Sequence, residues 1–82
     1  MPRVLAMGGD VARYTGGRSE FDVAATTVGG MILELDARWP GLGDYVERRM
    51  AVAIDGEIFQ DAYQVQLKPG SEIVLIPKIG GG

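Results

Sequence analysis

The glycines at the carboxyl end of the sequence are the residues best suited to chemistry. Gly80, Gly81 and Gly82 follow an apolar run, Ile73–Ile76, that is closed by Pro77. Glycine has no Cβ, so its backbone fits where a side chain would clash. A glycine in last position also offers the least hindered carboxylate that a chain can present. The composition of this end indicates chemistry at a backbone carboxylate.

The rest of the chain is then expected to act as a rigid handle for this tail. We expect one domain, 1–77, followed by a flexible tail, 78–82. From Pro77 to Gly82 an extended chain spans roughly 20 Å at ~3.3 Å per residue. That reach is enough to pass from a small domain into the active site of a partner protein.

Several other kinds of site are excluded or disfavoured by composition. The chain has no cysteine and no histidine, so it cannot build a Cys/His metal site, a cysteine nucleophile or a Ser-His pair. Its formal charge of −3 argues against nucleic-acid binding and is compatible with docking on a basic protein patch. Gly8-Gly9 and Gly16-Gly17 lack the residues of a phosphate-binding loop and are interpreted as turns. We expect no metal site, because the aspartates have no metal-loop spacing.

The sequence also carries no sign of export or membrane insertion. It opens on Met1-Pro2-Arg3-Val4 without a long apolar segment, and no apolar run approaches ~20 residues. The absence of cysteine fits a reducing compartment. A cytoplasmic location is therefore expected.

Short apolar or alternating runs predict a sheet, and turn residues divide it. The predicted strands are Val4–Met7, Glu20–Val23, Ala51–Ile54, Glu57–Phe59 and Ile73–Ile76. Residues 10–18 are expected to form a loop. Asp55-Gly56 favours a type I′ hairpin turn, in which both residues take positive φ, and Lys68–Ser71 predicts a second turn.

One stretch has the spacing of an amphipathic helix. Its apolar face is formed by Val28, Met31, Ile32, Leu35 and Trp39. The hydroxyl of Thr26 or Thr27 is available as N-cap, and Pro40 ends the helix. Gly29-Gly30 is expected to weaken the first turn by roughly 1 kcal/mol per glycine. A further short helical turn is expected over 44–48, capped by Asp44.

One helix that buries its apolar face against one sheet predicts a two-layer α+β domain. The first and last strands are expected side by side and parallel, because the helix lies between them in sequence. The helix covers one face, so alternate residues of the last strand face the other side and form an apolar patch, which either binds a partner or is covered by loops of the chain. We assign this partner surface to Val74, Ile76, Pro77 and Lys78.

From Thr26 to Gly82 the chain resembles the small sulfur carriers of the ubiquitin-like β-grasp family. It is most similar to the small subunit of molybdopterin synthase (MoaD-like) and less similar to the thiamin-pathway carrier (ThiS-like). The matching segments are Thr27-Val28, Arg38–Leu42, Val52–Gly56, Lys68–Ile73, Ile76-Pro77 and the glycine end. The resemblance implies a β-grasp fold with one main helix on a mixed sheet of four to five strands.

The resemblance further implies that the protein is a carried substrate and not an enzyme. An E1-like enzyme would use ATP to adenylate Gly82, and a persulfide donor protein would convert it to a thiocarboxylate. Gly80 and Gly81 would let the tail thread into narrow active sites. The thiocarboxylate would supply sulfur to the large subunit of molybdopterin synthase or to another sulfur-accepting enzyme. The chain itself would bind no cofactor.

Three other functions remain open at this point. The carrier could serve thiamin or cysteine biosynthesis. The chain could instead be a ubiquitin-like modifier that is joined through Gly82 to a lysine of a target protein. It could also be a non-covalent β-grasp binding module with an idle tail.

Overall fold

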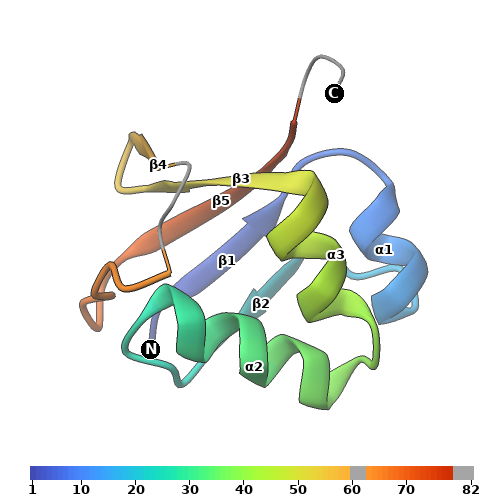
Figure 1. Ribbon diagram of the computed structural model, residues 1–82, viewed down its shortest axis with the longest axis horizontal. Coiled ribbons are helices and arrows are strands. Elements are labelled where there is room, and N and C mark those ends of the chain that lie inside the picture. Colours follow the sequence, from blue (N-terminus) through green and yellow to red (C-terminus); the bar gives the residue numbers. More distant parts are fainter. Residues whose placement is uncertain (60–62, 79–82) are drawn as a thin grey trace.

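The computed structural model describes residues 1–59 and 63–78 and contains five strands and three helices in that part of the chain (Figure 1). They follow one another as β1 (Arg3–Ala6), α1 (Asp10–Thr15), β2 (Glu20–Asp22), α2 (Val28–Arg38), α3 (Leu42–Arg49), β3 (Met50–Ile54), β4 (Glu57–Phe59) and β5 (Glu72–Pro77).

The strands form one mixed sheet in the order β2-β1-β5-β3-β4. β1 and β5 pair in parallel, and the other neighbouring strands pair antiparallel. The prediction that the first and last strands lie side by side and parallel is confirmed, and β5 is the central strand. β5 occupies this place because it is apolar along its length, and Ile73 and Leu75 are fully buried.

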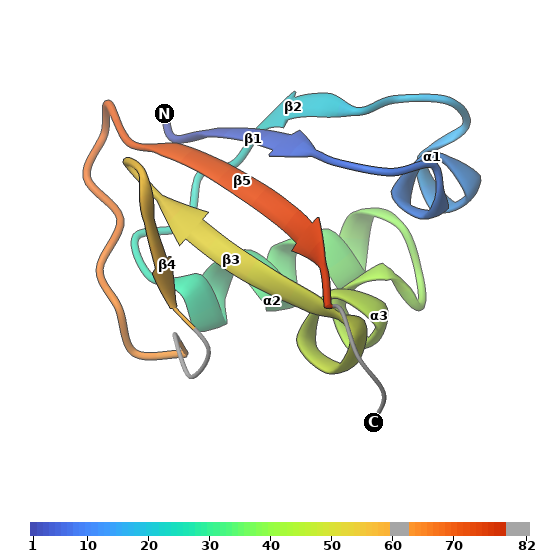
Figure 2. The same ribbon diagram turned by 90° about the horizontal axis from the view of Figure 1, so that it is seen from above.

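The helices α2 and α3 lie on the same side of the sheet (Figure 2). α2 buries Val28, Met31 and Leu35 almost completely, so the predicted apolar face is confirmed. The Thr27 hydroxyl caps this helix and accepts a hydrogen bond from the Gly30 amide at 3.0 Å. The Asp55-Gly56 turn also forms as predicted, with φ of 49° and 88°.

The first turn of α2 shows why a glycine stands at position 29. The Gly29 amide donates to the Tyr63 carbonyl at 2.8 Å, and the Val28 amide donates to the Val65 carbonyl at 3.0 Å. A Cβ on Gly29 would lie 2.6 Å from Cε2 of Tyr63. This glycine therefore permits close contact with the segment that leads to β5, which offsets the cost expected for a glycine in a helix.

The prediction of a loop over 10–18 is wrong in its first part, where the chain forms α1. The helix has only six residues and no side-chain N-cap, so its local signals are weak. Val11 and Thr15 lie four positions apart, on one face, and both are buried. Tertiary packing of this face stabilises the helix, as is common for short helices.

The predicted short helical turn at 44–48 is a longer helix, α3, and its predicted cap is wrong. α3 begins at Leu42, after Gly41 in the left-handed conformation. The cap is Asp36 of α2, whose Oδ1 accepts hydrogen bonds from the amides of Gly41 (3.1 Å), Gly43 (3.0 Å) and, more weakly, Asp44 (3.4 Å). The preceding helix thus supplies the acceptor that free amides at a helix start require.

Replacement of Asp36 by alanine is expected to lower the free energy of unfolding by about 1 kcal/mol, the usual contribution of a helix cap. Urea denaturation followed by circular dichroism measures the change. Glu47→Ala, on the exposed side of α3, is the matched control, because no hydrogen bond or ion pair of Glu47 occurs within 1–59 and 63–78. Equal midpoints for the two variants would contradict the assigned cap.

Candidate functional site

β5 connects the core to the carboxyl-terminal tail. Alternate residues of the strand point to opposite sides of the sheet, so Ile73 and Leu75 face the helices while Val74 and Ile76 face away. Pro77 pairs with Met50 at the end of the strand. Both Pro77 and Lys78 are exposed. The predicted reactive and threading residues, Gly80, Gly81 and Gly82, lie outside the described residues, and the assignments made for them stay predictions.

The face of the sheet opposite the helices carries a row of apolar side chains. Strand pairing places Leu5, Val74, Ala53 and Ile58 next to one another across four strands, and directly paired residues point to the same face. Ile58 is 62% exposed, and Leu5 and Val74 are half-buried. We call these four residues the outer row. Ile76 lies on the same face and pairs with Ala51.

The predicted partner surface is therefore divided by the structure. Val74 and Ile76 share the face of the outer row, as expected. Pro77 lies on the other side of β5, where a Cβ on Gly8 would lie 3.3 Å from its Cγ. This separation follows from the alternation of side chains along a strand. The role of these residues in partner binding stays a prediction.

A cleft between α1 and α3 lies close to the point where the chain leaves β5. It has a volume of about 320 Å³ and is lined by Asp10, Arg13, Tyr14 and Tyr45. The Tyr45 hydroxyl donates to Oδ2 of Asp10 at 2.7 Å. This hydrogen bond raises the pKa of Tyr45 above its ordinary value and keeps the hydroxyl a neutral donor. Sequence reasoning missed this contact, because its two residues are 35 positions apart.

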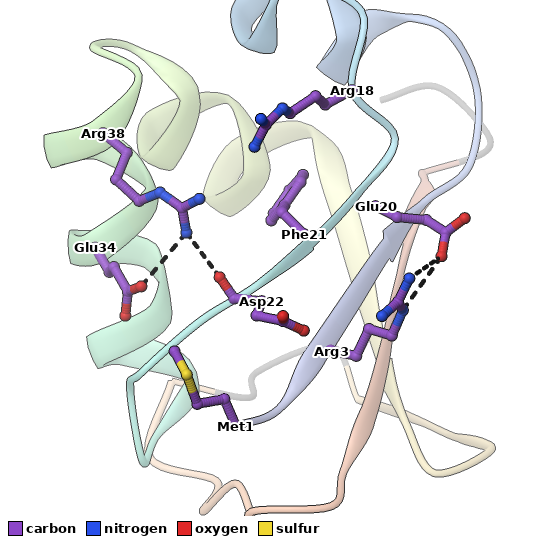
Figure 3. Close-up of a pocket in the computed structure, with 8 residues that line it drawn as sticks. All are labelled: Met1, Arg3, Arg18, Glu20, Phe21, Asp22, Glu34 and Arg38. Atoms are coloured by element: carbon purple, nitrogen blue, oxygen red, sulfur yellow. Dashed lines mark hydrogen bonds and ion pairs between the residues drawn. The ribbon is translucent and has the colours of Figure 1, made fainter.

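A second hollow, of about 540 Å³, lies beside β2 and is lined by charged residues (Figure 3). Arg38 donates to the Asp22 carbonyl at 2.7 Å and pairs with Glu34 at 3.5 Å. Arg3 pairs with Glu20 at 2.7 Å, and the hydrogen bond to this carboxylate raises the pKa of Arg3.

These interactions protect the outer edge of the sheet. Glu34 accepts hydrogen bonds from the amides of Ala24 and Ala25 at 2.9 and 3.0 Å, and Arg38 binds the Asp22 carbonyl. The free edge of β2 and the segment after it are thereby partly closed by side chains of α2, as is usual for edge strands. We therefore interpret this hollow as structural.

Within 1–59 and 63–78 no three acidic side chains are grouped so that they could hold a metal ion. None of the helices described in these ranges has the length and apolarity required to cross a bilayer.

Comparison with known families decides which kind of protein this is. The model of the ThiS family matches residues 9–82. This range includes the tail and every described helix and strand except β1. The chain belongs to the ThiS family. The ubiquitin-like sulfur-carrier type predicted from the sequence is thereby confirmed. Members of this family are small carrier proteins and not catalysts.

Solved structures show the same fold as this ThiS-family chain. CysO of Mycobacterium tuberculosis, described as an antigen, superposes with a TM-score of 0.83 at 17% identity, over 96% of this chain and 100% of its own. A chain of the BexX/CysO complex of Amycolatopsis orientalis gives 0.84 at 19% identity over 100% of both chains. SAMP1 of Haloferax volcanii gives 0.69 at 26% identity, over 99% of this chain and 98% of its own. No curated protein matches the sequence.

These structures confirm the predicted α+β β-grasp fold, with its main helix on a mixed five-stranded sheet. The prediction that the chain is more similar to the small subunit of molybdopterin synthase than to the thiamin-pathway carrier stays a prediction.

Proposed function

We propose that this ThiS-family chain carries sulfur as a thiocarboxylate on Gly82. The observation that carries the proposal is the family match, which continues through the glycine tail to residue 82. The domain supports it in two ways. β5 leads the chain out of the sheet at Pro77, and the apolar side chains of Val74 and Ile76 lie on one face of the sheet within three residues of this exit.

The chemistry requires activation of a carboxylate, which is a poor electrophile at neutral pH. An oxygen of the Gly82 carboxylate attacks the α-phosphorus of ATP on an E1-like enzyme, and pyrophosphate leaves. The terminal sulfur of a donor persulfide then attacks the carbonyl carbon, and AMP leaves. A thiol cleaves the sulfur–sulfur bond, which leaves the thiocarboxylate on Gly82 and a disulfide on the donor. The chain contributes the acyl group, and the activating enzyme contributes catalysis.

The sulfur acceptor in this proposal is the large subunit of molybdopterin synthase. It rests on the resemblance of segments such as Arg38–Leu42 and Val52–Gly56 to the small subunit of that enzyme. Enzymes of thiamin or cysteine biosynthesis are the alternative acceptors. A second function, conjugation to target lysines, is favoured by one observation, the fold shared with a protein named small archaeal modifier protein 1.

Intact mass spectrometry after incubation with ATP, a cognate activating enzyme and a persulfide donor tests the proposal. The exchange of oxygen for sulfur is the expected product. It adds nearly the same nominal mass as oxidation of one of the four methionines, so alkylation with a thiol-directed reagent identifies the thiocarboxylate. Loss of water with linkage to a lysine would support the modifier function. Absence of ATP–pyrophosphate exchange would reject both.

Replacement of Val74 and Ile76 by serine is expected to raise the KM for the activating enzyme about tenfold or more, because it removes apolar surface that docking would bury. The rate at saturation should change little. Leu33→Ser on α2 is the control, because Leu33 is 67% exposed and belongs to the helix layer on the other side of the sheet. An equal KM for the double variant and the control would show that the face of the sheet opposite the helices is not the docking surface.

A further inference from the structure

Where the chain leaves the sheet, Pro77 and Lys78 lie next to two other segments, which are joined to each other by a hydrogen bond. The first segment runs from the loop between β1 and α1 into the first residue of α1, and the second is the last two turns of α3. Figure 1 shows the end of β5 rising beside the β1–α1 loop and above the junction of α3 with β3. We call Gly8, Asp10, Tyr45 and the Arg49 carbonyl the collar.

The first part of the collar is a hydrogen bond beyond the end of β5. The Lys78 amide donates to the Arg49 carbonyl at 3.0 Å, one step past the pairing of Pro77 with Met50. Arg49 is the last residue of α3. The position of Lys78 therefore depends directly on where α3 ends.

The second part is the backbone of Gly8, which passes beside the ring of Pro77. Gly8 has a φ of +83°, a conformation that favours glycine. A Cβ at this position would lie 3.3 Å from Cγ of Pro77, closer than an ordinary van der Waals contact. The amide before it, that of Met7, donates to the Leu75 carbonyl at 2.8 Å and holds the loop on β5.

The third part joins the loop to α3. The Tyr45 hydroxyl donates to the carboxylate of Asp10 at 2.7 Å. Asp10 lies two residues after Gly8, and Tyr45 lies four residues before Arg49, on the same face of α3. A closed path therefore runs from Pro77 to the neighbouring Gly8, along the chain to Asp10, and through the hydrogen bond to Tyr45. It continues along α3 to Arg49 and returns through the Arg49 carbonyl to Lys78.

We infer that Gly8, Asp10 and Tyr45 are positioning residues that fix the direction in which the tail leaves the domain. The inference rests on the proposed function, in which Gly82 must enter the active site of another protein. An enzyme that accepts the tail has to order its backbone, and ordering costs conformational entropy. The collar orders the tail as far as Lys78 before the partner arrives, so this part of the cost is already met in the free protein.

Amide hydrogen exchange, measured by NMR, tests the collar without any partner. Tyr45→Phe removes only the hydroxyl that binds Asp10. Exchange of the Lys78 amide is expected to become about threefold to tenfold faster, the effect of losing one hydrogen bond. Tyr14→Phe is the matched control, since the described part of the chain offers its hydroxyl no hydrogen-bond partner and its ring lines the same cleft. Core amides, such as those of Val52 and Leu75, report any global loss of stability.

The same variants are then compared as substrates of the activating enzyme. Tyr45→Phe should raise KM about threefold to tenfold with little change in kcat, and Tyr14→Phe should match the wild type. Gly8→Ala should have an effect in the same direction, because it adds a strained φ and a close contact with Pro77.

Equal exchange at Lys78 in Tyr45→Phe and Tyr14→Phe would overturn the inference, as would faster exchange that is matched at Val52 and Leu75. An unchanged KM despite faster exchange would also overturn it. Failure of the wild-type chain to be adenylated would instead reject the proposed function, so the two failures are distinguishable.

Discussion

One alanine added after Gly82 is expected to lower the rate of adenylation by at least ~100-fold. The added residue moves the terminal carboxylate by roughly 3.5 Å along an extended chain and gives it a Cβ. A displacement of about 1 Å in an active site is enough to cost ~100-fold. The domain is unaffected, because the addition lies beyond the last strand, which ends at Pro77.

Deletion of Gly81 and Gly82 should have the same effect, because it draws the carboxylate back by roughly 7 Å. ATP–pyrophosphate exchange with the cognate activating enzyme measures both changes. Gly70→Ala is the control, since it adds one methyl group in a turn where a Cβ meets nothing within 4 Å. Near-normal exchange by the shortened or lengthened chain would show that the terminal carboxylate is not the reactive group.

The second large effect is expected on stability. Gly43→Ala should lower the free energy of unfolding by about 3 kcal/mol, because overpacking of a tight contact costs ~1–3 kcal/mol even where flexible side chains can move. A Cβ on Gly43 would lie 2.4 Å from the backbone oxygen of Ile32 and 2.7 Å from Cβ of Asp36. Neither atom can move without shifting α2.

A chain of this length has a total stability of roughly 4–12 kcal/mol, so a loss of this size is a large part of it. It corresponds to a fall in Tm of roughly 12–24 °C for a domain of 60–100 residues. Thermal unfolding by circular dichroism measures the shift. Gly70→Ala again serves as control and should change Tm little or raise it slightly. A small shift for Gly43→Ala would mean that the two helices are not held as closely as the structure shows.

The sequence does not predict the close packing of Gly29 and Gly43, for the same reason in both cases. Gly29 stands in a helical pattern where glycine is unfavourable, and Gly43 follows a turn where glycine is ordinary. The sequence marks neither as a contact. Their importance comes from Tyr63 and Ile32, which approach them only in the folded chain.

The sequence likewise predicts some of the helix boundaries and misses others. α2 was predicted because its apolar positions repeat over three turns and Thr27 and Pro40 mark its ends. α1 and the true start of α3 were missed because neither has a side-chain cap within its own segment. The hydrogen-bond acceptor for the first amides of α3 is Asp36, a residue of another helix, and no local sequence pattern predicts this contact.

The sequence by itself determined the apolar strand that carries the tail, the Asp55-Gly56 hairpin, the apolar face of α2 and the glycine end. These features depend on neighbouring residues, because hydrophobic periodicity and turn chemistry act over a few positions. Tertiary structure alone decided the rest: the outer row across four strands and the collar that joins Asp10 to Tyr45. Those contacts join residues far apart in the chain, so they exist only once strand pairing and helix packing have brought the segments together.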